Sequence, residues 1–200
     1  FVIAVIVFQP ELRRALIRLG AAGWLPGLGR DVSAMLDEVM QSVAYLSRNK
    51  VGALIAIERN TELGGLIERG RKLDAEVSTP LLNTIFWPGS ALHDMGVIIS
   101  QDRIAAASVL FPLTDNEALE AELGSRHRAA VGLSEESDAL VIIVSEETGA
   151  VSLAEHGILH RKLAPEALRK MLESRLARRP ADADRLKPDA QADAQAKQAS

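Results

Sequence analysis

Two short runs of purely apolar residues limit most strongly what this chain can fold into. Ala53–Ile57 and residues 139–144 contain no polar side chain and are bounded by glycine or polar residues. Such runs have the length of a β-strand, and a strand without polar alternation is usually buried on both faces. A sheet that is covered on both faces needs helices on each side, so the runs predict an α/β domain.

Further apolar segments predict the rest of the sheet. Gly96–Ser100 and residues 103–110 are separated only by Gln101-Asp102, which predicts a hairpin of two antiparallel strands. Residues 151–154 predict a shorter strand that is paired through Gly149. Together with the buried runs, these segments predict a mixed, twisted central β-sheet flanked by helices.

The predicted helices follow from apolar spacing and from helix start signals. Residues 32–46 carry apolar side chains at helical spacing, and Ser78-Thr79-Pro80 starts a helix that should end near Phe86. Asn60-Thr61 is predicted to cap a short helix that Gly64-Gly65 interrupts or ends. Further helices are predicted at 116–123, 126–133 and Pro165–Leu176.

The two ends of the chain differ in composition from its middle. Residues 1–8 are almost all apolar and are followed by three arginines within residues 13–18. This pattern is typical of the cytoplasmic end of a membrane helix, but a buried N-terminal strand or helix is equally compatible with it. Residues 179–200 have one leucine and no aromatic residue, which predicts a disordered tail. We therefore expect an anchor end with a linker helix at 1–30, a domain at 31–178 and a tail at 179–200.

Charge and composition argue against several classes of function. A formal net charge of −4 argues against broad binding to DNA, which needs a basic surface. The chain has no cysteine, which excludes disulfides, cysteine nucleophiles and cysteine zinc sites. It also lacks the Gly-x-x-x-x-Gly-Lys phosphate loop, the Gly-x-Gly-x-x-Gly fingerprint and the Gly-x-Ser-x-Gly elbow. Phosphate chemistry in this chain would therefore depend on arginines and a metal ion.

The first candidate site is His93-Asp94, which lies between the Pro88-Gly89-Ser90 turn and the strand at Gly96. An imidazole and a carboxylate at a strand entrance can bind a divalent cation, and the carboxylate can accept a proton from a hydroxyl group. Both residue types are also common in turns, so a purely structural role stays open for this pair.

The second candidate site runs from Gly124 to Arg128. Ser125 is predicted as the N-cap, which would put Arg126, His127 and Arg128 in the first turn of a helix. A helix N-terminus presents unpaired N–H groups and partial positive charge, so it attracts anions and disfavours arginines. A bound phosphate would resolve this conflict. The alternative is two solvated arginines on a surface helix.

The third candidate site is Ser145-Glu146-Glu147-Thr148-Gly149, at the exit of the apolar run 139–144. Carboxylates at the end of a strand can hold a metal ion. A solvated hairpin turn is the more frequent role of such a segment.

Taken together, these segments resemble the diadenylate cyclase family, over about residues 1–172. Residues 7–16 are similar to the stretch that joins the last membrane helix to the cyclase domain in the membrane-anchored branch of the family. The other matching motifs, in chain order, are Gly-Ala-Leu-Ile at 52–55, Ile-Glu-Arg-Asn-Thr at 57–61, Gly-x-x-Leu-Asp-Ala at 70–75, Leu-His-Asp at 92–94, Gly-Ser-Arg-His-Arg-Ala-Ala-Val-Gly at 124–132 and Val-Ser-Glu-Glu-Thr-Gly at 144–149.

The resemblance implies an activity. Members of the family join two ATP molecules into cyclic di-AMP and release two pyrophosphates. Two domains face each other with one ATP each, and the 3′-hydroxyl of each ATP attacks the α-phosphate of the other. Since one domain supplies only half of the site, a homodimer is expected to be necessary. Such a reaction needs in-line positioning and neutralised charge more than covalent help from the protein.

The resemblance also implies roles for single residues. Asp94 is expected to bind a divalent metal, Mn²⁺ or Mg²⁺ with Co²⁺ as a further candidate, and to help activate the hydroxyl group. His93 and Glu147 are the other expected metal contacts, and Phe111 is expected to touch the adenine through its backbone. The expected catalytic residues are Asp94, Arg126, His127 and Arg128. The expected ATP-binding residues are Leu73, Asp74, Met95, Gly96, Phe111, Ser125, Arg126, His127, Ser145 and Glu147.

The resemblance further implies a location and partners. We expect the full-length protein to be held at the cell membrane by N-terminal helices outside this chain, with the catalytic domain on the cytoplasmic side. Regulatory proteins are further candidate partners, besides ATP and the second copy of the domain.

One motif departs from the family. Where the family has Asp-Gly-Ala, this chain has Asp94-Met95-Gly96. The Met95 side chain either crowds the ribose or phosphate, or Gly96 provides the space instead. The departure motivates an alternative function, a catalytically impaired ATP-binding regulatory module of the same fold. Ser125 replaces a threonine of the family and keeps the hydroxyl group.

Overall fold

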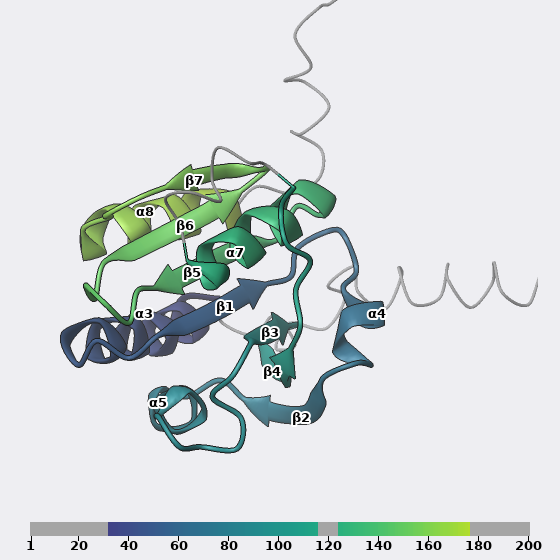
Figure 1. Ribbon diagram of the computed structural model, residues 1–200, viewed down its shortest axis with the longest axis horizontal. Coiled ribbons are helices and arrows are strands. Elements are labelled where there is room, and N and C mark those ends of the chain that lie inside the picture. Colours follow the sequence, from purple (N-terminus) through teal and green to yellow (C-terminus); the bar gives the residue numbers. More distant parts are fainter. Residues whose placement is uncertain (1–31, 116–123, 177–200) are drawn as a thin grey trace, which may run out of the picture. The chain divides into compact units, whose positions relative to one another are not determined.

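The computed structural model describes residues 32–115 and 124–176 (Figure 1). The expected anchor and linker at 1–30, the expected helix at 116–123 and the expected tail at 179–200 lie outside these residues. The outer bounds expected for the domain, 31 and 178, also lie outside them and stay a prediction. Within the two described segments, no helix has the length and apolar character that a membrane span requires.

One seven-stranded sheet organises the described residues, in the order β2-β4-β3-β1-β5-β6-β7. β1 is parallel to β3, and every other pair of neighbours is antiparallel, so the sheet is mixed as predicted. The strands are β1 Ala53–Ile57, β2 Arg71–Glu76, β3 Gly96–Ser100, β4 Arg103–Val109, β5 Leu140–Val144, β6 Val151–Glu155 and β7 Ile158–His160.

Helices cover both faces of this sheet (Figure 1). Ala53, Ile55 and Ile57 of β1 face the apolar cluster that α3, α5 and α8 form. Leu54 and Ala56 face the opposite cluster, to which α7 contributes. Every residue of β1 is therefore buried, as the unbroken apolar run predicted. The helices are α3 Val32–Arg48, α4 Gly64–Ile67, α5 Thr79–Phe86, α7 Ser125–Glu136 and α8 Pro165–Leu176.

The sequence patterns predicted the central strands of the sheet but not its two edge strands. The predicted strands correspond to β1, β3, β4, β5 and β6 within one residue at each end, and the hairpin of β3 and β4 is confirmed. β2 and β7 were not predicted as strands. β2 is the edge strand Arg-Lys-Leu-Asp-Ala-Glu, and its only half-buried residues are Leu73 and Ala75. β7 has three residues and lies at the opposite edge. An edge strand has a partner on one side only, so its apolar pattern is weak.

The predicted cap of the short helix is wrong. Gly64-Gly65 begins α4 instead of ending it, and Asn60-Thr61 binds a distant carboxylate instead of capping the helix. Asp138, just before β5, accepts hydrogen bonds from Asn60 Nδ2 at 2.7 Å and from the backbone N of Thr61 at 2.9 Å. Burial acts to raise the pKa of Asp138, but these hydrogen bonds outweigh it and lower the pKa. A tertiary contact has here replaced a local one.

A partly buried ion pair holds α8 against the sheet. Glu155, at the end of β6, accepts hydrogen bonds from Nε and Nη2 of Arg175, both at 2.6 Å. His160 Nε2 of β7 lies 3.2 Å from Glu155 Oε1. The hydrogen bonds from Arg175 lower the pKa of Glu155, and burial opposes them.

The variant Glu155→Gln should destabilise the fold in a pH-dependent way. Because Arg175 would lose its charged partner, the free energy of unfolding at pH 7 should fall by about 1–3 kcal/mol. The folded pKa of Glu155 is lowered, so the ionised side chain stabilises fully above its ordinary value of 4.5. That contribution is lost as the pH falls through the folded value. Denaturant titrations at several pH values measure the difference.

The matched control is Glu173→Gln on the same helix. Glu173 forms an exposed i,i+4 pair with Arg169 at 2.8 Å, and solvent screens such a pair, so its loss should leave the unfolding free energy nearly unchanged. Equal effects of the two variants, or a Glu155→Gln effect that persists at acid pH, would contradict the assignment.

Candidate functional site

The parallel pairing of β1 with β3 determines where Asp94 lies. Ile55 is opposite Val97, and Gly52 and Asp94 each precede that pair by three residues. Parallel strands start at the same end of a sheet, and neighbouring strands are about 5 Å apart. Asp94 and Gly52 therefore lie at the same end of the sheet, just before adjacent strands.

The antiparallel strands bring two more segments to this end. Ala53 is opposite Val144, so the turn at 145–149 leaves β5 where β1 starts. Gly96 is opposite Val109, so the chain also leaves β4 here. The first and third candidate sites of the sequence thus share one end of the sheet.

Arg126 connects the second candidate site to the same end. Its Nη1 donates a hydrogen bond to Glu146 Oε2 at 2.5 Å. The guanidinium lies over Gly52, where an added Cβ would be 2.7 Å from Arg126 Cζ. Gly52 provides the space for this ion pair, a role that sequence reasoning did not assign although it had noted the glycine before the strand. The start of α7 and Asp94 therefore lie at one end of the sheet.

The N-cap prediction for Ser125 is wrong by one residue. Gly124 is the N-cap of α7, with an extended backbone, and Ser125 is the first helical residue. The backbone N of His127 donates to the carbonyl oxygen of Gly124 at 3.0 Å. Glycine is accepted at N-caps because it adopts the required backbone angles readily. The Ser125 hydroxyl is therefore exposed at the helix start and is not used as a cap.

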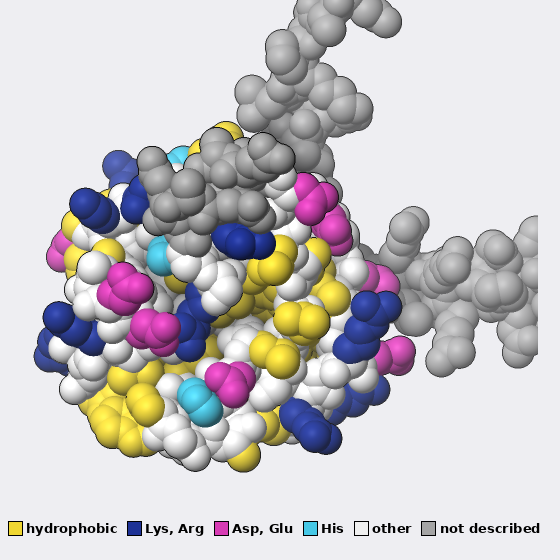
Figure 2. All heavy atoms as spheres, in the orientation of Figure 1, with side chains coloured by type: hydrophobic (Ala, Val, Ile, Leu, Met, Phe, Trp, Pro, Cys, Tyr) yellow, Lys and Arg dark blue, Asp and Glu magenta, His cyan; other side chains and the backbone are white. Residues whose placement is uncertain are grey.

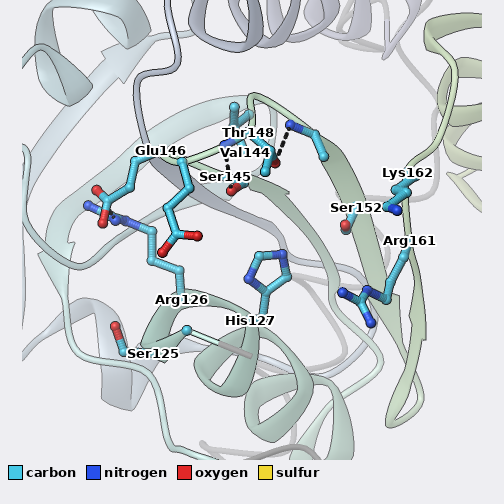
Figure 3. A pocket seen from close by; sticks show the side chains of 13 residues that line it. Ser125, Arg126, His127, Val144, Ser145, Glu146, Thr148, Ser152, Arg161 and Lys162 are labelled. Atoms are coloured by element: carbon cyan, nitrogen blue, oxygen red, sulfur yellow. Dashed lines mark hydrogen bonds and ion pairs between the residues drawn. The ribbon is translucent and has the colours of Figure 1, made fainter. Parts of the chain in front are cut away.

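A polar cavity of about 360 Å³ opens beside the start of α7 (Figure 3). Its walls come from the first turn of α7, from the turn between β5 and β6, and from the chain that follows β7. The expected ATP-binding residues that line it are Ser125, Arg126, His127, Ser145 and Glu147. The lining residues that sequence reasoning did not single out as functional are chiefly Ser152, Arg161 and Lys162.

His127 lies in the middle of this cavity. In Figure 3 its imidazole lies between Arg126 and Arg161. Burial lowers the pKa of His127 and the charge of Arg161 lowers it further, whereas Glu147 acts in the opposite direction. The imidazole is therefore neutral at pH 7 and can accept or donate a hydrogen bond.

His93 and Asp94 present two metal-binding atoms next to each other. His93 Nδ1 lies 2.5 Å from the carbonyl oxygen of Ser90, which can only accept, so Nδ1 carries the hydrogen. Nε2 then has a free electron pair and lies 3.5 Å from Asp94 Oδ1. Such a pair suits a divalent cation, or a proton on Nε2. The Asp94 side chain is 77% exposed, which leaves it accessible to a ligand.

The donor set fits a metal ion that is shared with phosphates. Among the described residues, no group of three or more His, Asp or Glu side chains could hold a metal ion alone. Mg²⁺ in nucleotide enzymes commonly uses one or two carboxylates together with substrate phosphates. His93 and Asp94 match that requirement, and Glu147, which lines the cavity, is a separate donor.

The Asp94-Met95-Gly96 departure has a packing partner. An added Cβ on Gly96 would lie 2.4 Å from Cζ of Phe111, so the buried Phe111 ring occupies the space that an alanine methyl would need. Met95 has a φ of 68°, in the left-handed region that favours glycine, and is 47% exposed. The backbone of this chain thus keeps a glycine-like conformation at 95, and Gly96 makes room for Phe111.

Eight expected site residues do not line the cavity: five that lie at the same end of the sheet, namely His93, Asp94, Met95, Gly96 and Phe111, and three others, namely Leu73, Asp74 and Arg128. Arg128 does not line it, and its carbonyl oxygen accepts a hydrogen bond from the backbone N of Thr114 at 3.2 Å. Leu73 packs against the cluster that includes α3. Asp74 pairs with Arg103, at the start of β4, away from the end where Gly96 and Val109 meet. Their roles in binding stay predictions.

Residues 40–159 match the family described as DisA bacterial checkpoint controller nucleotide-binding, abbreviated DAC. The chain belongs to the DAC family. It is 47% identical over 178 residues to the protein named cyclic di-AMP synthase CdaA of Bacillus subtilis, covering 87% of this chain and 65% of that protein. It is 43% identical over 176 residues to a diadenylate cyclase of Listeria monocytogenes, covering 86% and 64%. The chain thus spans just under two thirds of the length of these relatives.

Two solved structures are similar to this DAC domain. A double mutant of DacA from Staphylococcus aureus matches with a TM-score of 0.72 and 40% identity, covering 74% of this chain and 99% of that one. A protein from Bacillus cereus described as a hypothetical membrane spanning protein matches with a TM-score of 0.63 and 38% identity, covering 80% of each chain. The diadenylate cyclase fold predicted from the motifs is confirmed.

Gly96→Ala and Phe111→Leu should compensate for each other. The alanine methyl alone would displace the Phe111 ring, which should lower the unfolding free energy by about 1–3 kcal/mol. Phe111→Leu alone should also destabilise, by leaving a cavity. In the double variant the leucine leaves space for the methyl, so the combined loss should be smaller than the sum by about 0.5 kcal/mol or more. Chemical denaturation of all four proteins measures this.

Gly65→Ala is the matched control for the added methyl. A Cβ on Gly65 meets no atom within 4 Å, and alanine favours a helix, so this variant should be neutral or slightly more stable. Additive losses in the double variant would show that Gly96 and Phe111 are not coupled.

Arg161→Gln should raise the pKa of His127. The guanidinium charge of Arg161 disfavours the protonated imidazole, so its removal should shift the titration of His127 upward, towards the ordinary value of 6.5. Histidine NMR titration of the ligand-free protein measures the shift. Arg169→Gln, on α8 and outside the cavity, should leave the His127 titration unchanged; an equal shift in both variants would contradict the geometry.

Proposed function

We propose that this domain is a diadenylate cyclase, which joins two ATP molecules into cyclic di-AMP and releases two pyrophosphates. The main support for the proposal is that Asp94 lies at the same end of the sheet as the first turn of α7, which borders a polar cavity. Membership of the DAC family and relatives named as cyclic di-AMP synthase and diadenylate cyclase support it.

The cavity supplies groups suited to a triphosphate. Arginine forms paired hydrogen bonds with phosphate, and the start of α7 adds backbone N–H groups. Arg126 would share its charge between Glu146 and a phosphate. The Ser145 hydroxyl accepts a hydrogen bond from the backbone N of Thr148 at 3.3 Å, which leaves its own hydrogen free to donate. His127, neutral at pH 7, can donate one further hydrogen bond.

A divalent cation completes the proposed site. Mn²⁺, Mg²⁺ or Co²⁺ would be held by Asp94 and His93, and Glu147 of the cavity lining is a further candidate ligand. When bound, the ion would neutralise phosphate charge and favour ionisation of the attacking hydroxyl group. Asp94 itself would accept the proton of that hydroxyl or hold the ion, since its carboxylate is exposed.

The reaction needs a second copy of the domain. One domain that holds one ATP can present a 3′-hydroxyl, but the α-phosphate that it attacks belongs to the other ATP. Exposed apolar side chains lie at this end of the sheet, namely Met95 at 47% and Leu110 at 68% exposure. Figure 2 shows apolar side chains beside charged and histidine side chains around a hollow. A face-to-face homodimer would cover this surface.

The full-length protein would bring two domains together at the membrane. Anchoring by N-terminal helices is consistent with the relatives being longer than this chain and with the description of the Bacillus cereus structure. The cyclase domain would then lie on the cytoplasmic side, where regulatory proteins could reach it.

The second candidate function is an ATP-binding regulatory module without catalysis. The observation that favours it is Met95, a long exposed side chain where the family has glycine. Such a module would bind ATP and yield no dinucleotide with any of the three metals.

Mass spectrometry of the reaction with ATP and Mn²⁺ or Mg²⁺ separates the two functions. Cyclic di-AMP is the expected product, and Asp94→Asn should reduce its rate at least a thousandfold while the protein stays folded. Asp37→Asn is the matched control, because Asp37 lies on α3 and pairs with Arg169. Absence of the dinucleotide with every metal and at high protein concentration would refute the cyclase and leave the regulatory module.

A further inference from the structure

Arg161 and Lys162 extend the cavity beyond the motif residues. Both follow β7 and both line the same cavity as Ser125 and Arg126. In Figure 3 the Arg161 side chain lies on the far side of His127 from Arg126. The cavity therefore has two basic ends, one at the start of α7 and one after β7.

The strand register places Arg161 on the same face of the sheet as α7. Leu153 of β6 is opposite His160, so Arg161 follows opposite Ser152. Ser152 is in turn opposite Ile143, which packs in the cluster that includes α7. The backbone N of Leu163 donates to the carbonyl oxygen of Val151 at 2.8 Å, which holds this stretch against β6.

Ser152 supplies a polar group between the two basic ends. It is only 2% exposed and lines the cavity. A hydroxyl group that lines a cavity can donate a hydrogen bond to an oxygen atom of a ligand.

The charges of the cavity favour an anion at its β7 end. Glu146 is 2.5 Å from Arg126 and offsets the charge at the α7 end. Arg161 and Lys162 add basic side chains at the other end, and Glu147 is the remaining acidic side chain among the described residues of the lining. With His127 neutral, these described residues carry a net charge of +1, from Arg126, Arg161 and Lys162 against Glu146 and Glu147.

The order of the strands indicates which phosphates of the substrate would lie at the β7 end of the cavity. Asp94 lies before β3, Arg126 lies over the start of β1, and Arg161 follows β7, three strands further along. The α-phosphate must lie near the attacking hydroxyl group and its metal. The β- and γ-phosphates then continue away from Asp94, towards β6 and β7.

We propose that Arg161 and Lys162, with the Ser152 hydroxyl, form a subsite for the β- and γ-phosphates of ATP and for the pyrophosphate that leaves. The inference rests on the proposed cyclase function. Cyclic di-AMP keeps only the α-phosphates and does not reach this subsite. The subsite therefore binds substrate and leaving group and does not bind product, which favours exchange of cyclic di-AMP for new ATP.

Equilibrium binding of three probes to Arg161→Gln tests the subsite. The probes are 3′-deoxy-ATP, which lacks the attacking hydroxyl group, pyrophosphate and cyclic di-AMP, each with Mg²⁺. Loss of one charge-assisted contact should weaken 3′-deoxy-ATP and pyrophosphate about tenfold or more, whereas the dissociation constant for cyclic di-AMP should change less than about twofold. Lys162→Met should show the same selectivity with a smaller effect.

The controls distinguish loss of the subsite from a general loss of folding and from failure of the cyclase proposal. Arg169→Gln removes an arginine outside the cavity and should leave all three affinities unchanged, and Arg161→Lys should recover part of the lost affinity. Equal weakening of cyclic di-AMP and pyrophosphate, or no effect on either, would overturn the subsite. Failure of the wild-type chain to form cyclic di-AMP would refute the cyclase function, while selective weakening of pyrophosphate would still support the subsite.

Discussion

The position of β1 between a parallel and an antiparallel neighbour is the constraint on which the site depends. Because β3 is parallel to β1, the loop that contains Asp94 enters the sheet at the end where β1 starts. The antiparallel partner β5 makes the acidic turn leave the sheet at that end. Gly52, which has no side chain, then admits the ion pair of Arg126 and Glu146, and that pair ties α7 to both strands. Opposite charges from three distant parts of the chain are thereby brought to one end of the sheet.

Sequence patterns could predict what depends on local periodicity. The unbroken apolar runs gave β1 and β5, and the same reasoning gave the β3–β4 hairpin, because burial on both faces leaves a strong pattern. The conflict between arginines and a helix start pointed to the first turn of α7, which does border the cavity. The edge strands β2 and β7 have no such pattern. Arg161 was missed for this reason, since only the pairing of β7 with β6 places its side chain over the cavity.

The altered motif shows how a local departure can be explained by a distant residue. From the sequence alone, two explanations of Met95-Gly96 were open: the Met95 side chain crowds the nucleotide, or Gly96 provides the space. The structure shows that the Phe111 ring fills the space above Gly96 and that Met95 keeps a left-handed backbone. Residues 95, 96 and 111 therefore form one packing unit beside Asp94, and replacing Gly96 alone would disturb the chain that leaves β4. The same unit presents Met95 to solvent, where the second copy of the domain would approach.

Paramagnetic broadening by Mn²⁺ tests most directly whether Asp94 and the start of α7 serve one nucleotide. Isotope-labelled protein would be titrated with Mn²⁺ and 3′-deoxy-ATP, and amide resonances would be followed by NMR. Residues 93–96, 125–127 and 145–147 should broaden together, and only when the nucleotide is present. Broadening confined to one of these segments, or located away from this end of the sheet, would contradict this expectation.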